Sequence, residues 1–164
     1  MNARANRFST SFTLTAFLLL AAPAAPGAFA QETGYAAMEG VTSIQTAFDF
    51  RVGDADVALG HLNLIHAMLD DPSMIRDGDR PRIVVVFIGP SVNLVSTDGN
   101  GYPEIADKVE AMEADGVRFE ICMTAAGAHD VSAASILPEI IQVGNGWISL
   151  IGYQEQGYAM IADF

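Results

Sequence analysis

The sequence feature that most constrains the fold is a short apolar run, RIVVVFI, at Arg82–Ile88. After the arginine every residue is apolar, and five of the six are β-branched. β-branched side chains favour strands, and a strand without alternating polar residues is covered on both faces. Gly89-Pro90 ends the run. The run therefore predicts a central strand of a parallel sheet with helices on both sides.

Segments typical of strands and of helices alternate around this run. Ile44–Val52 has the composition of a strand, and Ala55–Leu69 carries apolar residues at helical spacing after Asp54, whose side chain suits an N-cap. We expect further segments in this order: a helix that Pro103 opens, a strand at Val117–Cys122, a short helix within Ala125–Ser135, a strand at Glu139–Val143, a helix at Gly146–Gln156 with Trp147, Leu150 and Ile151 inward, and a strand at Tyr158–Ala162. The alternation predicts a three-layer α/β sandwich with a mainly parallel sheet of about five strands.

The carboxyl ends of these strands are the expected place for a functional site, because ligands of open α/β sheets bind there. Cys122 ends one predicted strand, and the loops after Val52 and Gly89 lie at the same edge. Apolar and polar residues alternate along the strand that Cys122 ends. The alternation places Val117, Phe119 and Ile121 on one face and Arg118, Glu120 and Cys122 on the other.

The N-terminal thirty residues have the pattern of a cleaved secretory signal peptide. Met1–Arg7 is basic, Phe12–Ala22 is apolar, and small residues precede a cleavage point after Ala30. A membrane anchor is the alternative, but the apolar run is shorter than the roughly 20 residues that span a bilayer. We therefore expect a periplasmic protein with no stable membrane insertion, a flexible lead at 31–43 and one α/β domain at 44–164.

The charge of the chain limits the partners that it can bind. Its 20 acidic and 8 basic residues give a formal net charge of −12, and loss of Arg4 and Arg7 with the signal makes it −14. Nucleic acids and anionic membranes are bound through Lys and Arg, so we expect neither as a partner.

Cys122 is the only cysteine, so the chain can form no internal disulfide. An unpaired cysteine in an exported protein suggests a reactive thiol or an intermolecular bond, whereas a small buried hydrophobe is the alternative. If a helix begins after Cys122, its free N–H groups would favour a thiolate. His129, seven residues later, could serve as a base or could be an ordinary loop residue.

The sequence carries no motif for a metal or an organic cofactor. The nucleophile elbow and the phosphate-binding glycine motifs are missing. The histidines are not spaced four residues apart, and a zinc site would need such a pair or paired cysteines. We expect His66 to pack beside the apolar face of its helix and His61 to be solvated, with no bound cofactor or metal.

Four segments occur in order: Asp49–Asp71 with its strand, acidic turn and helix, then RIVVVFIGP, DGVRFEICMTA and LPEIIQVGNGWISLIGYQEQGYAMIAD. Together they resemble the DsrE/DsrF-like family of sulfur-relay proteins, and the resemblance spans roughly Ser43–Phe164. The resemblance implies a flavodoxin-like sheet, homo-oligomers such as trimers or hexamers, and a link to sulfur metabolism. It also implies that Cys122 takes up sulfur as a persulfide and passes it to a partner.

The leading functional hypothesis is a periplasmic sulfur carrier of sulfurtransferase-like chemistry, with Cys122 as the sulfur acceptor and a protein or small sulfur compound as donor and acceptor. A non-catalytic oligomeric binding or assembly module, with Cys122 merely packed, is the alternative. A redox sensor that dimerises through Cys122 is a third hypothesis.

Overall fold

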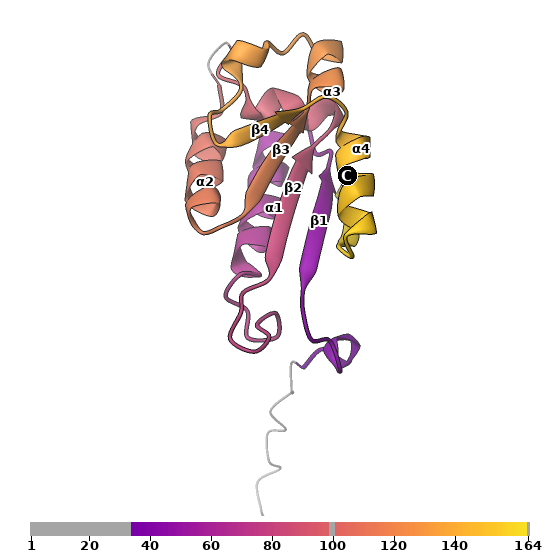
Figure 1. Ribbon diagram of the computed structural model, residues 1–164. Coiled ribbons are helices and arrows are strands. Elements are labelled where there is room, and N and C mark those ends of the chain that lie inside the picture. Colours follow the sequence, from indigo (N-terminus) through magenta and orange to yellow (C-terminus); the bar gives the residue numbers. More distant parts are fainter. Residues whose placement is uncertain (1–33, 99–100, 164) are drawn as a thin grey trace, which may run out of the picture. The chain divides into compact units, whose positions relative to one another are not determined.

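The computed structural model describes residues 34–98 and 101–163, which form one parallel sheet flanked by helices (Figure 1). The predicted signal peptide at 1–30 and residues 31–33 of the predicted lead lie outside the described residues. In the remaining lead, Ala36–Met38 forms a short 3₁₀ helix, η1, and Arg76 Nε donates to the carbonyl oxygen of Val41 at 2.8 Å.

The sheet has five parallel strands in the order β4-β3-β2-β1-β5. The strands are β1 Gln45–Phe50, β2 Arg82–Phe87, β3 Arg118–Cys122, β4 Ile140–Val143 and β5 Ala159–Asp163. The apolar run predicted as the central strand is β2, the middle strand of the sheet. The predicted α/β fold with a parallel, flavodoxin-like sheet is confirmed.

The connections contain four α-helices and two further 3₁₀ helices among the described residues. They are α1 Ala55–Ala67, η2 Gly89–Val95, α2 Pro103–Ala114, α3 Met123–Ala128, η3 Ala133–Ser135 and α4 Gly146–Glu155. Asp54 caps α1 as predicted, because its carboxylate accepts from the N–H of Val57 at 3.0 Å. Within the described part of the chain, no helix is both long and apolar enough to cross a membrane.

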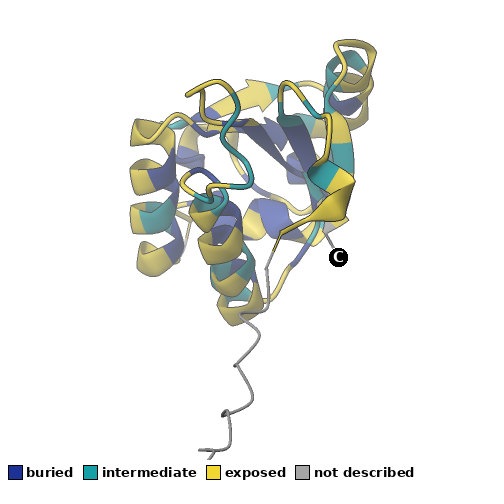
Figure 2. Ribbon diagram, turned by 90° about the horizontal axis from the view of Figure 1, so that it is seen from below, coloured by how far each residue is buried: buried dark blue, intermediate teal, exposed yellow. Residues whose placement is uncertain are grey.

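The chain crosses the sheet in one direction from β1 to β4 and then reverses, so that β5 lies beside β1. Right-handed crossovers place helices on opposite faces when the direction of travel reverses. Accordingly α1 and α2 cover one face of the sheet, and α4 packs on the other. Figure 2 shows buried strands between helices whose outer sides are exposed.

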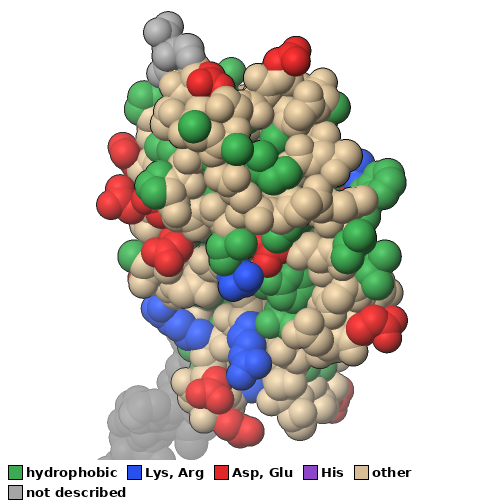
Figure 3. Space-filling view, turned by 45° about the horizontal axis from the view of Figure 1, so that its top comes forward, with side chains coloured by type: hydrophobic (Ala, Val, Ile, Leu, Met, Phe, Trp, Pro, Cys, Tyr) green, Lys and Arg blue, Asp and Glu red, His purple; other side chains and the backbone are tan. Residues whose placement is uncertain are grey.

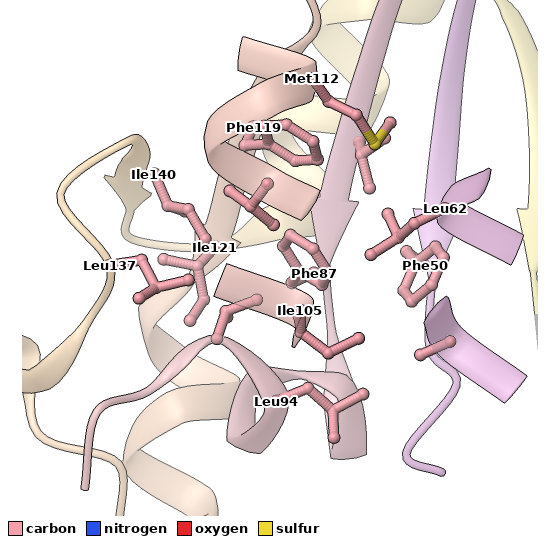
Figure 4. Packing of buried hydrophobic residues seen from close by; sticks show 14 of the residues in the cluster. Phe50, Leu62, Phe87, Leu94, Ile105, Met112, Phe119, Ile121, Leu137 and Ile140 are labelled. Carbon is pink, nitrogen blue, oxygen red and sulfur yellow. The ribbon is translucent and has the colours of Figure 1, made fainter. Parts of the chain in front are cut away.

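The larger apolar core fills the space between the sheet and the helices α1 and α2 (Figure 4). Phe87 lies at its centre, with its ring centroid 5.3 Å from that of Phe50 and 5.9 Å from that of Phe119. A smaller cluster on the α4 side contains Cys122 and Leu150. The alternation predicted for β3 is therefore correct, since Phe119 and Cys122 contribute to different clusters.

The predicted inward face of α4 is wrong in part. Leu150 is buried, but Trp147 is 58% exposed and Ile151 is 59% exposed. The inner face of α4 instead carries Ser149 and Tyr153, which reach a carboxylate buried in β3. A buried acid in the sheet requires polar partners, so apolar side chains of α4 are left on the outer side.

Candidate functional site

Cys122 lies where β3 ends and α3 begins. Its Sγ accepts a hydrogen bond from the N–H of Ala125 at 3.4 Å, so the thiol caps the helix that follows it. The residue is only 4% exposed. It is therefore held by its own backbone turn at the carboxyl edge of the sheet, the place that the sequence predicted.

The connections after β3 and β4 leave the sheet toward opposite faces. Ala126 of α3 packs into the larger core, whereas α4 covers the other face. Thr124 links the two connections by hydrogen bonds, because its N–H and Oγ1 donate to the carbonyl oxygen of Gly144 at 3.0 and 2.7 Å. Divergence of neighbouring connections is the arrangement that opens ligand crevices in α/β sheets.

A pocket of about 280 Å³ lies at this divergence. Its lining residues are Arg51, Ile88, Gly89, Cys122, Thr124, Ala125, Ala128, His129, Asn145 and Trp147. The structure thus brings together the two residues that the sequence singled out, Cys122 and His129. It adds one cation, one amide and the only tryptophan of the chain.

Gly146 lets the start of α4 approach the thiol closely. A Cβ atom at this position would lie 2.8 Å from Ile88 Cδ1 and 3.0 Å from Cys122 Cβ, so the neighbouring side chains would have to shift to admit it. Asn145 caps α4 by accepting from the N–H of Trp147 at 3.0 Å. These two residues place Trp147 at the mouth of the pocket.

Arg51 supplies the positive charge of the pocket. Its Nε and Nη2 each donate to the carboxylate of Asp49 at 2.9 Å, and its guanidinium lies 5.7 Å from the ring centroid of Trp147. The bidentate pair fixes the guanidinium plane, and the indole ring favours a cation beside it. Arg51 is therefore a held cation at the rim of the pocket.

His129 ends α3 on the exposed side of the pocket. Its Nδ1 lies 3.4 Å from Nδ2 of Asn93, a contact in which the amide nitrogen donates and the ring nitrogen accepts.

Glu120 lies two residues before Cys122 and is buried between β3 and α4. Its carboxylate accepts from Ser149 Oγ, from Tyr153 OH at 2.6 Å and from Arg118 Nε at 2.9 Å. Burial raises the pKa of Glu120, but these three hydrogen bonds together outweigh it, so the pKa is lowered. Burial and the bond to Glu120 raise the pKa of Tyr153 to about 12. The network attaches α4 to the strand that carries the thiol.

The other two histidines lie on α1. His66 contacts Asp115 at 2.7 Å and Lys108 at 2.8 Å, so it bridges toward α2. The prediction that His61 is solvated is wrong, because its Nδ1 is buried and the ring lines a groove between α1 and β5. In the described ranges, no group of three or more His, Cys, Asp or Glu side chains is arranged to hold a metal ion.

Sequence reasoning missed Arg51, Asn145 and Glu120 and misplaced Trp147. A signal existed for two of them. Arg51 directly precedes Val52, and the loop after Val52 was expected at the site edge. Asn145-Gly146 is a typical start of a helix. Nothing in the sequence marked Glu120, because an acid in an alternating strand usually faces solvent.

Comparison with known proteins supports the family resemblance. The model of the DsrE/DsrF-like family matches residues 30–162. The fold resembles that of MTH1491, a protein of unknown function from Methanobacterium thermoautotrophicum, at 22% identity and a TM-score of 0.61, over 73% of this chain and 99% of that one. It also resembles the ychN protein from E. coli, at 13% identity and a TM-score of 0.54, over 74% and 99% of the two chains. No curated protein matches the sequence.

Proposed function

The chain belongs to the DsrE/DsrF-like family, and from this premise we propose that it is a sulfur carrier that holds sulfane sulfur on Cys122. The observation that carries the proposal is the position of this thiol, at the carboxyl edge of the sheet and in the wall of a pocket. Family membership supports a role of the sulfur-relay type. The particular chemistry at Cys122 is our inference from the site.

The proposed reaction needs no oxidant. The Cys122 thiolate attacks the sulfane sulfur of a donor, a new S–S bond forms, and the bond between that sulfur and the rest of the donor breaks. The electron pair of the broken bond leaves with the donor remnant. A thiol of the partner then attacks the outer sulfur of the persulfide, and Cys122 leaves as a thiolate. His129 lines the same pocket, and we propose that its ring, once it releases the contact with Asn93, is the base that takes the proton of the thiol.

We further propose that the protein acts in the periplasm as a homo-oligomer, a trimer or a hexamer, which exchanges sulfur with a small sulfur compound or a partner protein. The outer face of α4 supports an oligomer. Trp147, Ile148 and Ile151 are all exposed there, on a helix without charged residues between Gly146 and Gln154. A helix that is apolar on its outer side as well as its inner side is usually covered by another surface.

A non-catalytic assembly module is the second candidate function. It is favoured by the burial of Cys122, which packs with Val86, Ile88 and Leu150. The same burial argues against a sensor that dimerises through a disulfide at this position. A module of this kind predicts slow reaction of Cys122 with iodoacetamide and an unchanged oligomer in Cys122→Ser.

Intact-mass measurement after exposure to thiosulfate or polysulfide tests the carrier. We expect a gain of about 32 Da per acquired sulfur atom in the wild type, reversed by a thiol reductant, and no gain in Cys122→Ser. Transfer of the label to a small thiol would show that the sulfur can be passed on. A wild-type protein that gains no mass under either condition would remove the main support for the proposal.

A further inference from the structure

We infer that the pocket is selective for sulfane-sulfur donors whose leaving group is an anion, and that Arg51 binds this anion. The inference rests on the proposed sulfur chemistry for the identity of the ligand. Its physical basis is separate from that chemistry, because the pocket joins a thiol to a held guanidinium.

Arg51 has donors left for a ligand. An arginine side chain has five N–H donors, and the carboxylate of Asp49 accepts from two of the Arg51 nitrogens, Nε and Nη2. Within residues 34–98 and 101–163, no other side chain or carbonyl is bonded to this guanidinium. Arg51 lines the pocket and Asp49 does not, so the wall of the cavity carries the guanidinium and not the carboxylate.

The charge around Arg51 makes it the one place in this pocket where an anion is attracted. The described chain contains six Lys and Arg residues, and Arg51 alone among them lines the pocket. No Asp or Glu lines it. The protein as a whole is strongly acidic, and Figure 3 shows red side chains spread over the visible face with the blue ones mostly in its lower part. An anionic donor is thus repelled by the general surface and attracted only locally.

Apolar residues in the lining reduce the screening of a charge inside the pocket by water. Ile88, Ala125 and Ala128 contribute apolar walls, and Trp147 covers the guanidinium. Attraction between opposite charges is stronger beside apolar walls than in open water. About 280 Å³ of space is more than one sulfur atom needs, so the donor remnant can occupy the pocket together with the sulfur that is transferred.

Thiosulfate illustrates the balanced step. The Cys122 thiolate attacks the outer sulfur, the S–S bond of thiosulfate breaks, and its electron pair leaves with sulfite, so total charge is conserved. Arg51 would hold the sulfonate end before the step and the sulfite after it. An organic persulfide that carries a carboxylate offers the same chemistry, and the two sources can be compared directly as donors.

The first test compares alkylation of Cys122 by iodoacetate, an anion, with alkylation by iodoacetamide, its neutral analogue. The ratio of the two rates cancels the intrinsic reactivity of the thiol. We expect Arg51→Gln to lower this ratio roughly fivefold, the size expected for one partly exposed charge. The charge-balanced double variant Asp49→Asn with Arg51→Gln should lower it as well. Asp49→Asn alone should raise it, because the charge of Arg51 is then unopposed.

Arg82→Gln is the matched control. Arg82 is an exposed arginine at the start of β2, at the opposite end of the sheet, and its replacement makes the same change in net charge. The ratio should stay at the wild-type value in this variant. An unchanged ratio in Arg51→Gln, or an equal fall in both variants, overturns the inference.

The second test does not need a reactive thiol. Trp147 is the only tryptophan, and it contacts Arg51, so its fluorescence reports on the pocket directly. In Cys122→Ser, titration with thiosulfate and separately with a carboxylated organic persulfide should give a saturable fluorescence change. The change should be lost when Arg51→Gln is added and kept when Arg82→Gln is added. A change that persists without Arg51, or no saturable change at all, contradicts the inference.

The two proposals fail separately. If the wild type gains no sulfur but shows the Arg51-dependent preference for anions, the sulfur carrier is wrong and the anion site stands. If sulfur is gained at equal rates with and without Arg51, the carrier stands and the anion site is wrong.

Discussion

At the scale of single residues, the shape of the pocket depends most on Gly146, because glycine has no side chain. The first turn of α4 lies directly against Ile88 and Cys122, so a single added carbon would force these side chains or the helix to shift. The helix contains a second glycine, Gly152, at which an added Cβ meets nothing within 4 Å. The two glycines therefore separate the effect of close packing from the general effect of glycine in a helix.

We predict that Gly146→Ala lowers the free energy of unfolding by about 1–3 kcal/mol, because overpacking displaces α4 from the sheet. Gly152→Ala should instead be neutral or raise it by roughly 0.5–1 kcal/mol, since alanine favours helix. Urea denaturation of both variants measures the difference. Equal stability of the two would show that α4 does not need the close approach.

At this scale, sequence reasoning identified the residue that carries chemistry but not its surroundings. The position of Cys122 followed from strand alternation and from the rule that sites lie at carboxyl edges. Arg51 and Trp147 come close only in three dimensions, one from the residue that follows β1 and the other from α4, and Asp49 lies near the end of β1. One sequence does not show which strand receives which helix, so this part of the site could not be predicted.

Among the elements, the contact between β3 and α4 decides the shape of the site. It is made by a buried carboxylate, Glu120, whose partners Ser149 and Tyr153 come from α4. The sequence pattern predicted the helix and its bounds well. It predicted the wrong inward side chains, because hydrophobic spacing takes no account of a buried acid on the neighbouring strand.

The Glu120 network should make stability depend on pH. The pKa of Glu120 is lowered in the folded state, so the ionised carboxylate stabilises the fold fully above the unfolded pKa of about 4.3. This stabilisation is lost as pH falls through the folded-state pKa. We predict that Glu120→Gln lowers the free energy of unfolding at pH 7 by roughly 1–3 kcal/mol and flattens its decrease below pH about 4.3. Denaturant unfolding as a function of pH measures both effects.

Glu110→Gln, which changes an exposed carboxylate on α2, is the matched control and should retain the wild-type profile. If Glu120→Gln and the wild type lose stability in parallel on acidification, the network is not the source of the pH dependence.

At the scale of the whole molecule, the parallel sheet and its two helical layers were predictable, because a strand such as β2 is stable only when covered on both sides. The order of the strands was not predicted. The outer face of α4 was also not foreseen, since its apolar side chains were assigned to the interior. Exposed apolar residues on that face support the proposed oligomer.

We predict that the double variant Ile148→Ser and Ile151→Ser converts the proposed oligomer into monomers, because it removes apolar area that association would bury. Light scattering coupled to size-exclusion chromatography measures the mass. Leu64→Ser removes an equally exposed apolar residue from α1 and should leave the mass unchanged. A double variant that keeps the wild-type mass would place the interface elsewhere.

The reversal of the chain between β4 and β5 has a consequence for biosynthesis. During translation β1 to β4 emerge in the order in which they pair, so each strand can join its neighbour as it appears. One edge of β1 has no partner until β5 emerges, since Thr46 pairs with Ala159. The nascent chain therefore carries an open strand edge from the emergence of β1 to that of β5, and a thiol not yet covered by α4 from the emergence of Cys122 to that of α4. A chain that ends before β5 would therefore keep one edge of β1 open to mispairing.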